Sequence, residues 1–146
     1  MRIMALDYGA RTVGVAVTDP LGLTVQGVET VRREHEDKLR QTLARITTLI
    51  GEFGVGEIVV GLPLNMDGSE GERALKSRAF AEKVAKRTGL PVYLQDERLT
   101  SVEADERMRE AGLSAKERKK IIDMVAAQVI LEDHLASPAK SGPAGT

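Results

Sequence analysis

Asp7 is the residue that points most directly to chemistry, because it follows a short apolar run at residues 3–6. Such a run is typical of a buried strand, and a second one, at residues 13–17, begins only a few positions later. An ionised carboxylate placed where a buried strand emerges costs free energy unless a positive group meets it. Asp7 therefore requires a cation, either a basic side chain or a metal ion.

A second acidic position follows the apolar segment at residues 92–95, which also has the composition of a strand. Asp96 and Glu97 come directly after it. In open sheets with crossover helices, ligands gather outside the carboxyl ends of the strands, where both Asp7 and this pair should lie. Asp96 could equally serve the turn alone, but Thr100 is placed to cap the next helix, which leaves Glu97 without a structural role.

The third acid, Asp123, belongs to the last predicted helix. Ala127 and Ile130 follow it at helical spacing, so its carboxylate shares the stripe that should face the sheet. Acidic residues are uncommon in such a packing face. Lys119 and Lys120 lie one turn earlier and could simply neutralise Asp123, and this alternative stays open.

The three carboxylates come from separate elements of a chain that has no cysteine and two histidines, so they describe a site with oxygen ligands only. Such a site favours Mg²⁺ or Mn²⁺ over zinc. Two ions roughly 4 Å apart would activate water and stabilise the leaving oxygen of an in-line displacement at phosphorus. The residues therefore predict hydrolysis of phosphodiester bonds, with Asp7, Glu97 and Asp123 as metal ligands and catalytic residues.

The composition limits the partners of this site. With 146 residues, 42% apolar and 29% charged, the chain suits one globular domain. No apolar run is long enough to span a bilayer and the N-terminus lacks a signal-peptide pattern, so we expect a cytoplasmic protein. A net charge of −1 does not favour nucleic-acid binding overall, so phosphates would have to meet local basic patches. The candidate patches are Arg32 and Arg33; Lys83, Lys86 and Arg87; and Lys116, Arg118, Lys119 and Lys120.

The elements that must position the acids follow from changes in hydrophobic period. The gap between the first two apolar runs is too short for a helical crossover, so they should form an antiparallel hairpin. A third strand is expected at 23–28, after the breakers Pro20 and Gly22. The remaining elements are expected as a helix after residue 37, a strand at 57–62, a helix from 69 to about 88, a strand at 92–95, a short helix from 100 that Gly112 closes, and a last helix from 114 to about 135.

Three Ser/Thr-x-x-Glu capping boxes mark predicted helix starts, at Ser69, Thr100 and Ser114. Short connections pair the first three strands antiparallel, and right-handed crossovers add the last two in parallel. The predicted fold is α/β, a five-stranded mixed sheet with helices on both faces. Residues 1–135 would form this single domain, and residues 136–146, rich in small residues and proline, a disordered tail.

Four segments resemble the YqgF family, also called RuvX, of pre-16S rRNA nucleases and Holliday junction resolvase-like proteins. They are LDYGARTVGVAV at 6–17, VGLPLNMDG at 60–68, DERLTSVEA at 96–104 and DMVAAQVIL at 123–131. The resemblance covers essentially the whole chain before the predicted tail. It implies a ribonuclease H-like fold and a divalent-metal nuclease whose acids match Asp7, Glu97 and Asp123.

The resemblance leaves two substrates open. The family is linked to maturation of the 5′ end of the small-subunit rRNA precursor, while its relation to RuvC resolvases implies branched DNA. A symmetric junction resolvase would need a dimer, whereas the RNA substrate is compatible with a monomer. RuvC-type sites use a further aspartate near the last acid, and no second acid lies one turn from Asp123. A fourth ligand would come from water or Asp96.

Polar and basic residues near the acids are candidates for holding phosphates. Asn65 lies in a loop before a helix N-terminus, where free N–H groups can bind phosphate. Arg11 and Arg98 flank two of the acids and could clamp phosphates, although salt bridges to neighbouring acids would explain them nearly as well. The predicted substrate-binding residues are Arg11, Asn65, Arg98, Lys119 and Lys120.

Two other functions compete with a nuclease. The Asp-x-Gly turn at Asp7 resembles the phosphate loop of actin-like ATPases and sugar kinases. Those enzymes close two such domains around the nucleotide, and this chain has the length for one. The other competitor is a scaffold that binds rRNA precursor or a protein without cutting, and three intact acids weigh against it.

Overall fold

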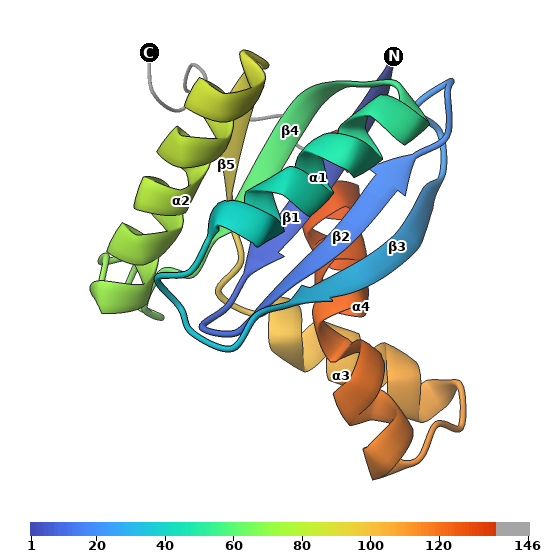
Figure 1. Ribbon diagram of the computed structural model, residues 1–146. Helices are drawn as coiled ribbons and strands as arrows, with labels where there is room; N and C mark the ends of the chain where they lie inside the picture. The colour runs from blue at the N-terminus through green and yellow to red at the C-terminus, as the bar shows by residue number, and fades with distance from the viewer. Residues whose placement is uncertain (137–146) are drawn as a thin grey trace.

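The computed structural model describes residues 1–136, which form a five-stranded mixed sheet with helices on both faces (Figure 1). The strands lie in the order β3-β2-β1-β4-β5. Their bounds are β1 Arg2–Tyr8, β2 Thr12–Thr18, β3 Val25–Arg32, β4 Val55–Leu62 and β5 Val92–Asp96. The helices are α1 Arg40–Phe53, α2 Glu72–Thr88, α3 Thr100–Glu110 and α4 Ala115–Ala136.

The directions of the strands are the predicted ones. β1 and β2 are antiparallel, as are β2 and β3, while β4 pairs in parallel with both β1 and β5. The third strand begins two residues later and ends four residues later than the predicted 23–28, because its pairing with β2 continues to the partners Thr12 and Arg32. This pairing includes a bulge, since Val15 lies opposite Glu29 and the next residue lies opposite Gly27.

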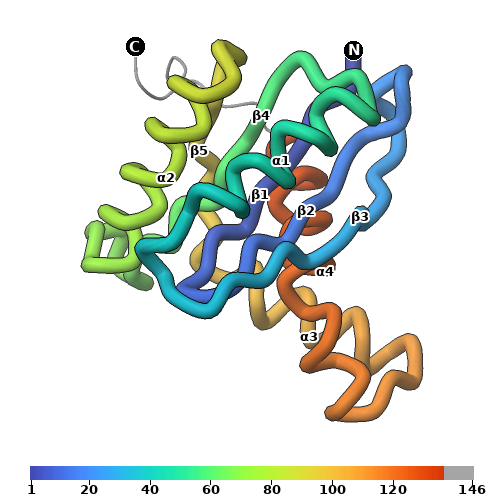
Figure 2. The backbone as a smooth tube through the Cα atoms, in the orientation of Figure 1, coloured from blue at the N-terminus to red at the C-terminus, as the bar shows by residue number. Residues whose placement is uncertain are grey.

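The two faces of the sheet carry separate apolar cores. One core gathers Leu6, Val15 and Val60 of the sheet with Ile46 of α1 and Phe80 of α2, all buried. The other face is covered by α4, which Figure 2 shows passing behind β1 and β2. There small sheet residues such as Ala5 and Ala16 pack against the helix. α3 packs on α4 through a third cluster, and the pair projects beyond the edge of the sheet (Figure 1).

Only one of the three predicted capping boxes forms. Ser114 Oγ accepts the N–H of Glu117 (3.2 Å), and Glu117 Oε1 accepts the N–H of Ser114 (2.8 Å). The box at Ser69 is wrong, because that hydroxyl is bound to Asp67 and α2 begins later, behind Gly71. The box at Thr100 is also wrong, since α3 has Leu99 at its N-cap and no side-chain cap, and Thr100 is its first helical residue.

Two further expectations concern the C-terminal boundary of the domain and membrane-spanning segments. α4 runs one residue past the predicted domain boundary, to Ala136. Apart from that residue, the predicted tail at 136–146 lies outside the described residues. In the described part of the chain, no helix is long and apolar enough to cross a membrane.

Gly14 sets the distance between α4 and the sheet. A Cβ at this position would overlap the backbone carbonyl group of Asp123, and it would lie 2.9 Å from the backbone nitrogen of Met124. The helix backbone therefore rests directly on β2, which only glycine permits. A second close approach lies at Gly27 of β3, where a Cβ would meet the Met124 side chain.

We predict that Gly14→Ala lowers the free energy of unfolding by about 3 kcal/mol, the upper end of typical overpacking costs, because the obstacle is backbone that cannot rotate away. Gly51→Ala is the matched control, since a Cβ there meets nothing within 4 Å, and it should stabilise α1 by about 0.5–1 kcal/mol. Urea denaturation of both variants measures the difference. Equal stability of the two would show that α4 does not rest on Gly14.

Candidate active site

Asp7 lies near the end of β1, on the face of the sheet that α4 covers. Side chains alternate along a strand, and Leu6 and Tyr8 belong to the core under α1 and α2, whereas Ala5 packs with α4. Asp7 follows Ala5 by two positions, so its carboxylate shares the α4 face. The side chain is partly exposed at the edge of the sheet, where β1 leads into the turn before β2.

Glu97 approaches Asp7 from the side of β1 on which β4 lies. Its backbone N–H donates to the carbonyl oxygen of Leu62 and its own carbonyl oxygen accepts the N–H of Thr100, both at 3.1 Å. A Cβ at Gly61 would lie 2.7 Å from Cδ of Glu97, so the carboxyl group occupies the space of a missing side chain. The parallel pairing of β1 with β4 ends at Leu6 and Val60, and Asp7 and Gly61 are the next residues of the two strands.

Asp123 joins the other two acids from α4. Its backbone carbonyl lies over Gly14, which is the partner of Asp7 in the pairing of β1 with β2. Ala127, one turn later, is buried against the sheet, as the predicted stripe requires. The three acids therefore come from three separate elements and meet at the end of β1. Gly14 lies on one neighbouring strand and Gly61 on the other.

The proximity of these acids changes their protonation. Burial and the charge of Asp123 raise the pKa of Asp7 to about 6, although a hydrogen bond with Glu97 acts in the opposite direction. Burial, the charge of Asp7 and their shared hydrogen bond raise the pKa of Glu97 to about 9. Both pKa values are raised, so the pair holds a proton more tightly than two separate carboxyl groups would, and the two groups share it.

The donor chemistry of this group fits a hard divalent cation. The three side chains offer only oxygen, and the raised pKa values mark a place where negative charge lacks compensation. Within residues 1–136, no three acidic, histidine or cysteine side chains lie close enough together to hold an ion as they stand. A cation would replace the shared proton, and ligation by Asp7, Glu97 and Asp123 stays a prediction.

Asp96 and Arg98 form an exposed ion pair beside the acids. Arg98 Nη2 lies 2.8 Å from Asp96 Oδ2, and the backbone N–H of Arg98 also donates to Asp96. Burial raises the pKa of Asp96, but the hydrogen bonds and charge of Arg98 outweigh it and lower the pKa. Arg98 Nη1 further donates to the carbonyl oxygen of Met66 (3.2 Å). Arg98 therefore forms the salt bridge to a neighbouring acid that the sequence analysis gave as the alternative to phosphate binding. Asp96 is a poor fourth metal ligand, because Arg98 already engages its carboxylate.

Asn65 lies in a loop that is closed by its own hydrogen bonds. Asn65 Nδ2 donates to the hydroxyl of Ser69 (2.9 Å), and the Asn65 N–H donates to the carbonyl oxygen of Ser69 (2.8 Å). Hydrogen bonds from the side chain and backbone of Ser69 lower the pKa of Asp67. The structure gives Asn65 a role in shaping this loop, and contact with a phosphate stays a prediction.

Three exposed cations remain from the predicted substrate-binding set. Arg11 lies in the turn between β1 and β2, and its carbonyl oxygen accepts the N–H of Arg33 (2.8 Å). Lys119 and Lys120 lie on α4, one turn before Asp123. Among residues 1–136, neither lysine forms an ion pair with Asp123, so the alternative that they merely neutralise it does not hold in this structure.

Gly14 and Gly61 are the residues of the site that the sequence interpretation missed. Gly14 admits the backbone of Asp123, and Gly61 admits the carboxyl group of Glu97. A signal was present, because a glycine inside a strand pattern often marks the close approach of another group. Both glycines interrupt apolar strands at the level of Asp7.

We predict that the metal-free protein loses stability as the pH rises. The pKa of Glu97 is near its ordinary value of 4.5 in the unfolded chain and about 9 in the folded protein, so its stabilising contribution is complete below 4.5 and is lost as the pH rises through 9. Glu97→Gln keeps a hydrogen-bonding group and has no proton to lose, so its advantage over wild type should grow from pH 5 to pH 9. Thermal melting in EDTA measures this, with the exposed Glu82→Gln as control. An advantage that does not change with pH would contradict the shared proton.

Comparison with known proteins identifies close relatives by sequence. The family model described as "RuvX: Holliday junction resolvase" matches residues 1–137. A protein of Lachnospira eligens named "Putative pre-16S rRNA nuclease" is 53% identical over 140 residues, covering 96% of this chain and 100% of that protein. A Myxococcus xanthus protein of the same name is 51% identical over 135 residues, covering 92% and 87%.

Solved structures share the fold at low sequence identity. The structure described as "T. thermophilus RuvC in complex with Holliday junction substrate" matches with a TM-score of 0.59 and 15% identity, covering 98% of this chain and 99% of that chain. The fowlpox virus Holliday junction resolvase matches with a TM-score of 0.54 and 12% identity, covering 90% and 94%. These likenesses confirm the predicted ribonuclease H-like fold. Together with the match of the family model over residues 1–137, they complete the identification: the chain belongs to the RuvX family.

Proposed function

We propose that this protein is a nuclease that hydrolyses phosphodiester bonds in the 5′ region of the small-subunit rRNA precursor. The observation that carries the proposal is the convergence of Asp7, Glu97 and Asp123 from three separate elements. Gly14 makes room for the backbone of Asp123 beside Asp7, and Gly61 makes room for the carboxyl group of Glu97. The substrate comes from the names of relatives that are about half identical over nearly the whole chain. A protein acting on this precursor would work in the cytoplasm.

Asp7, Glu97 and Asp123 would hold Mg²⁺ or Mn²⁺, since all their donor atoms are oxygen. Two bound ions would supply an activated water and charge stabilisation for the leaving oxygen. The chain's own contribution is to bring the carboxyl groups together at the end of β1 and to keep their backbone supports rigid. Gly14 and Gly61 provide that rigidity, because each is in direct contact with a segment carrying an acid.

The cations around the acids would position the substrate. Arg11, Lys119 and Lys120 are exposed, and they offer charge to phosphates on either side of the bond to be cut. Arg98 and Asn65 would contribute by fixing the loop that follows β4, because both are engaged in hydrogen bonds there. Binding through phosphates suits a chain whose described part has few aromatic residues to stack on bases.

Cleavage of branched DNA is the second candidate, and the description of the matching family favours it specifically. The same carboxylates would serve, because the chemistry at phosphorus is the same for both nucleic acids. The two candidates differ in assembly, since a symmetric junction presents two equivalent bonds and would require a dimer. Parallel assays on precursor RNA and on a four-way DNA junction, with the oligomeric state measured by sedimentation, separate them.

We predict that Asp7→Asn lowers the rate of RNA cleavage in Mn²⁺ or Mg²⁺ by at least about a hundredfold, the scale of losing one preorganised electrostatic group in an active site. The variant should melt no lower than wild type, because it removes a carboxylate from a crowded acidic site. Glu82→Gln, an exposed carboxyl change on α2, should retain the wild-type rate.

The rate is measured with purified proteins and an end-labelled precursor fragment that carries the 5′ extension. If Asp7→Asn cuts as fast as wild type, Asp7 has no part in catalysis and the proposed site is wrong. A wild-type protein that cuts the DNA junction and leaves the precursor RNA intact would favour the second candidate.

A further inference from the structure

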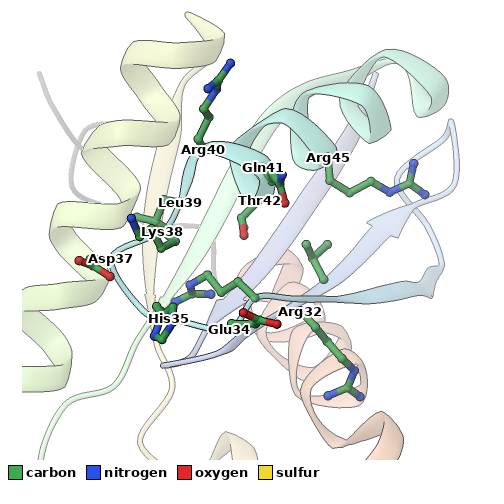
Figure 3. A pocket seen from close by; sticks show the side chains of 12 residues that line it. Arg32, Glu34, His35, Asp37, Lys38, Leu39, Arg40, Gln41, Thr42 and Arg45 are labelled. Atoms are coloured by element: carbon green, nitrogen blue, oxygen red, sulfur yellow. The ribbon is translucent and has the colours of Figure 1, made fainter.

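A hollow of about 930 Å³ lies between the end of β3 and the start of α1, apart from the three acids (Figure 3). Its lining comes from one continuous stretch of chain, residues 31–35 and 37–42, together with Arg45. Figure 3 shows Thr42 and Gln41 on the first turn of α1, with charged side chains spread around the rim. The sequence interpretation assigned no function to this connection beyond noting Arg32 and Arg33.

The lining of the hollow is strongly cationic. It includes five arginine or lysine side chains and two acidic ones, in a chain whose net charge is −1. Arg45 is paired with Glu29 (2.6 Å), and Arg33 is occupied by backbone carbonyl groups. Arg32 donates to a backbone carbonyl of α4. Within residues 1–136, no ion pair engages Lys38 or Arg40, so two cations around the hollow are free for an anionic partner.

The start of α1 adds a fixed positive potential to these side chains. Its N-cap residue, Leu39, makes no side-chain cap, and the first turn contains no acidic residue. The N–H groups of the first turn are therefore not satisfied within the helix or by a cap, and Arg40, Gln41 and Thr42 all line the hollow. Helix N-termini of this kind attract phosphate groups.

The hollow opens at the same end of the sheet, along the strand direction, as the three acids. Thr12, at the start of β2, pairs with Arg32, at the end of β3, so β3 ends beside the turn that follows β1. Two strand spacings, roughly 10 Å, separate β1 from β3. The acids lie on the α4 face and the hollow lies beside α1, so a nucleic-acid strand that contacts both passes around the end of β3.

Two hydrogen bonds tie the wall of the hollow to the site. Arg33 Nη2 donates to the carbonyl oxygen of Gly9 (2.6 Å), in the turn just after Asp7. Arg32 Nη2 donates to the carbonyl oxygen of Lys120 (3.2 Å), one turn before Asp123 on α4. Arg32 therefore lines the hollow and also contacts α4 near Asp123. It continues the row of exposed cations that begins at Lys120.

The geometry points to a binding site for a single nucleic-acid strand, whose phosphates lie on Lys38, Arg40 and the first turn of α1 as the strand leaves the three acids. The inference rests on the proposed function, and it adds the path of the substrate. A hollow of about 930 Å³ is of the size that holds a drug-like ligand. A few nucleotides of one strand fit in this volume.

The test measures binding separately from cleavage. Asp7→Asn protein in EDTA is titrated against a short labelled single-stranded RNA, the same sequence as DNA, and the RNA annealed to its complement. Binding is measured by fluorescence anisotropy from about 50 to 200 mM salt. Adding Lys38→Gln and Arg40→Gln should weaken binding of both strands at least about fivefold at 0.1 M salt. The slope of log K against log salt should fall by roughly 1.4, since each lost phosphate contact contributes about 0.7.

The matched control adds Lys86→Gln and Arg87→Gln to the same parent. These exposed cations end α2, and they lie at the edge of the sheet opposite the acids. Although the sequence also offers them as a basic patch, the structure places them away from the end of β1, so the control should bind like the parent (Figure 1). Unchanged affinity and slope in the Lys38 and Arg40 variant, an equal loss in the control, or a greater loss for duplex than for single strands would each overturn the proposal. If the strand binding behaves as expected but wild type cuts neither nucleic acid, the proposed function fails and the binding site stands.

Discussion

The convergence of Asp7, Glu97 and Asp123 on the end of β1 is the constraint on which the rest of the structure depends. Like charges that are brought together repel, and partial burial removes much of the water that would screen them. The fold holds them together by removing side chains on both sides of Asp7, at Gly14 and Gly61, so that helix backbone and a carboxyl group fill the space. Two apolar cores on opposite faces of the sheet stabilise an arrangement that the acids alone would oppose.

Much of the fold could be predicted, because it depends on patterns that extend over many residues. The change from strand to helical period, the short first connections and the right-handed crossovers together predict five strands, the first three antiparallel and the last two parallel. The position of β4 beside β1 comes from the structure. The helices begin within three residues of the predicted positions, but two of the three capping boxes do not form, because a capping box is only four residues long and its side chains can have other partners. Ser69 binds Asp67 instead, while Ser114, with no such competitor in its surroundings, forms its box with Glu117.

The acids of the candidate site could be located from sequence because each is exceptional in its own element: two follow buried strands and one lies on a packing stripe. What surrounds them could not be located in this way. Arg98 is adjacent to Glu97 in sequence, yet it turns to Asp96 and to the loop after β4. The basic hollow could not be predicted from the sequence, because residues 32–40 carry both signs of charge. Only the structure shows which acid of this stretch is held in ion pairs with other side chains.

An acidic site that acts on a polyanion faces an electrostatic problem, since the groups that hold a metal also repel the substrate before the metal is bound. The chain has no overall positive charge to attract nucleic acid. Free cations lie instead around the hollow, between the end of β3 and the start of α1, away from the acids that repel a phosphate. Arg32 connects this surface to α4. Attraction at the hollow would hold a strand at the edge of the sheet, and neutralisation of the carboxylates would then admit its neighbouring phosphate. The separation of the two charges, acids on the α4 face and cations around α1, is therefore part of how such a site selects a strand and orients it.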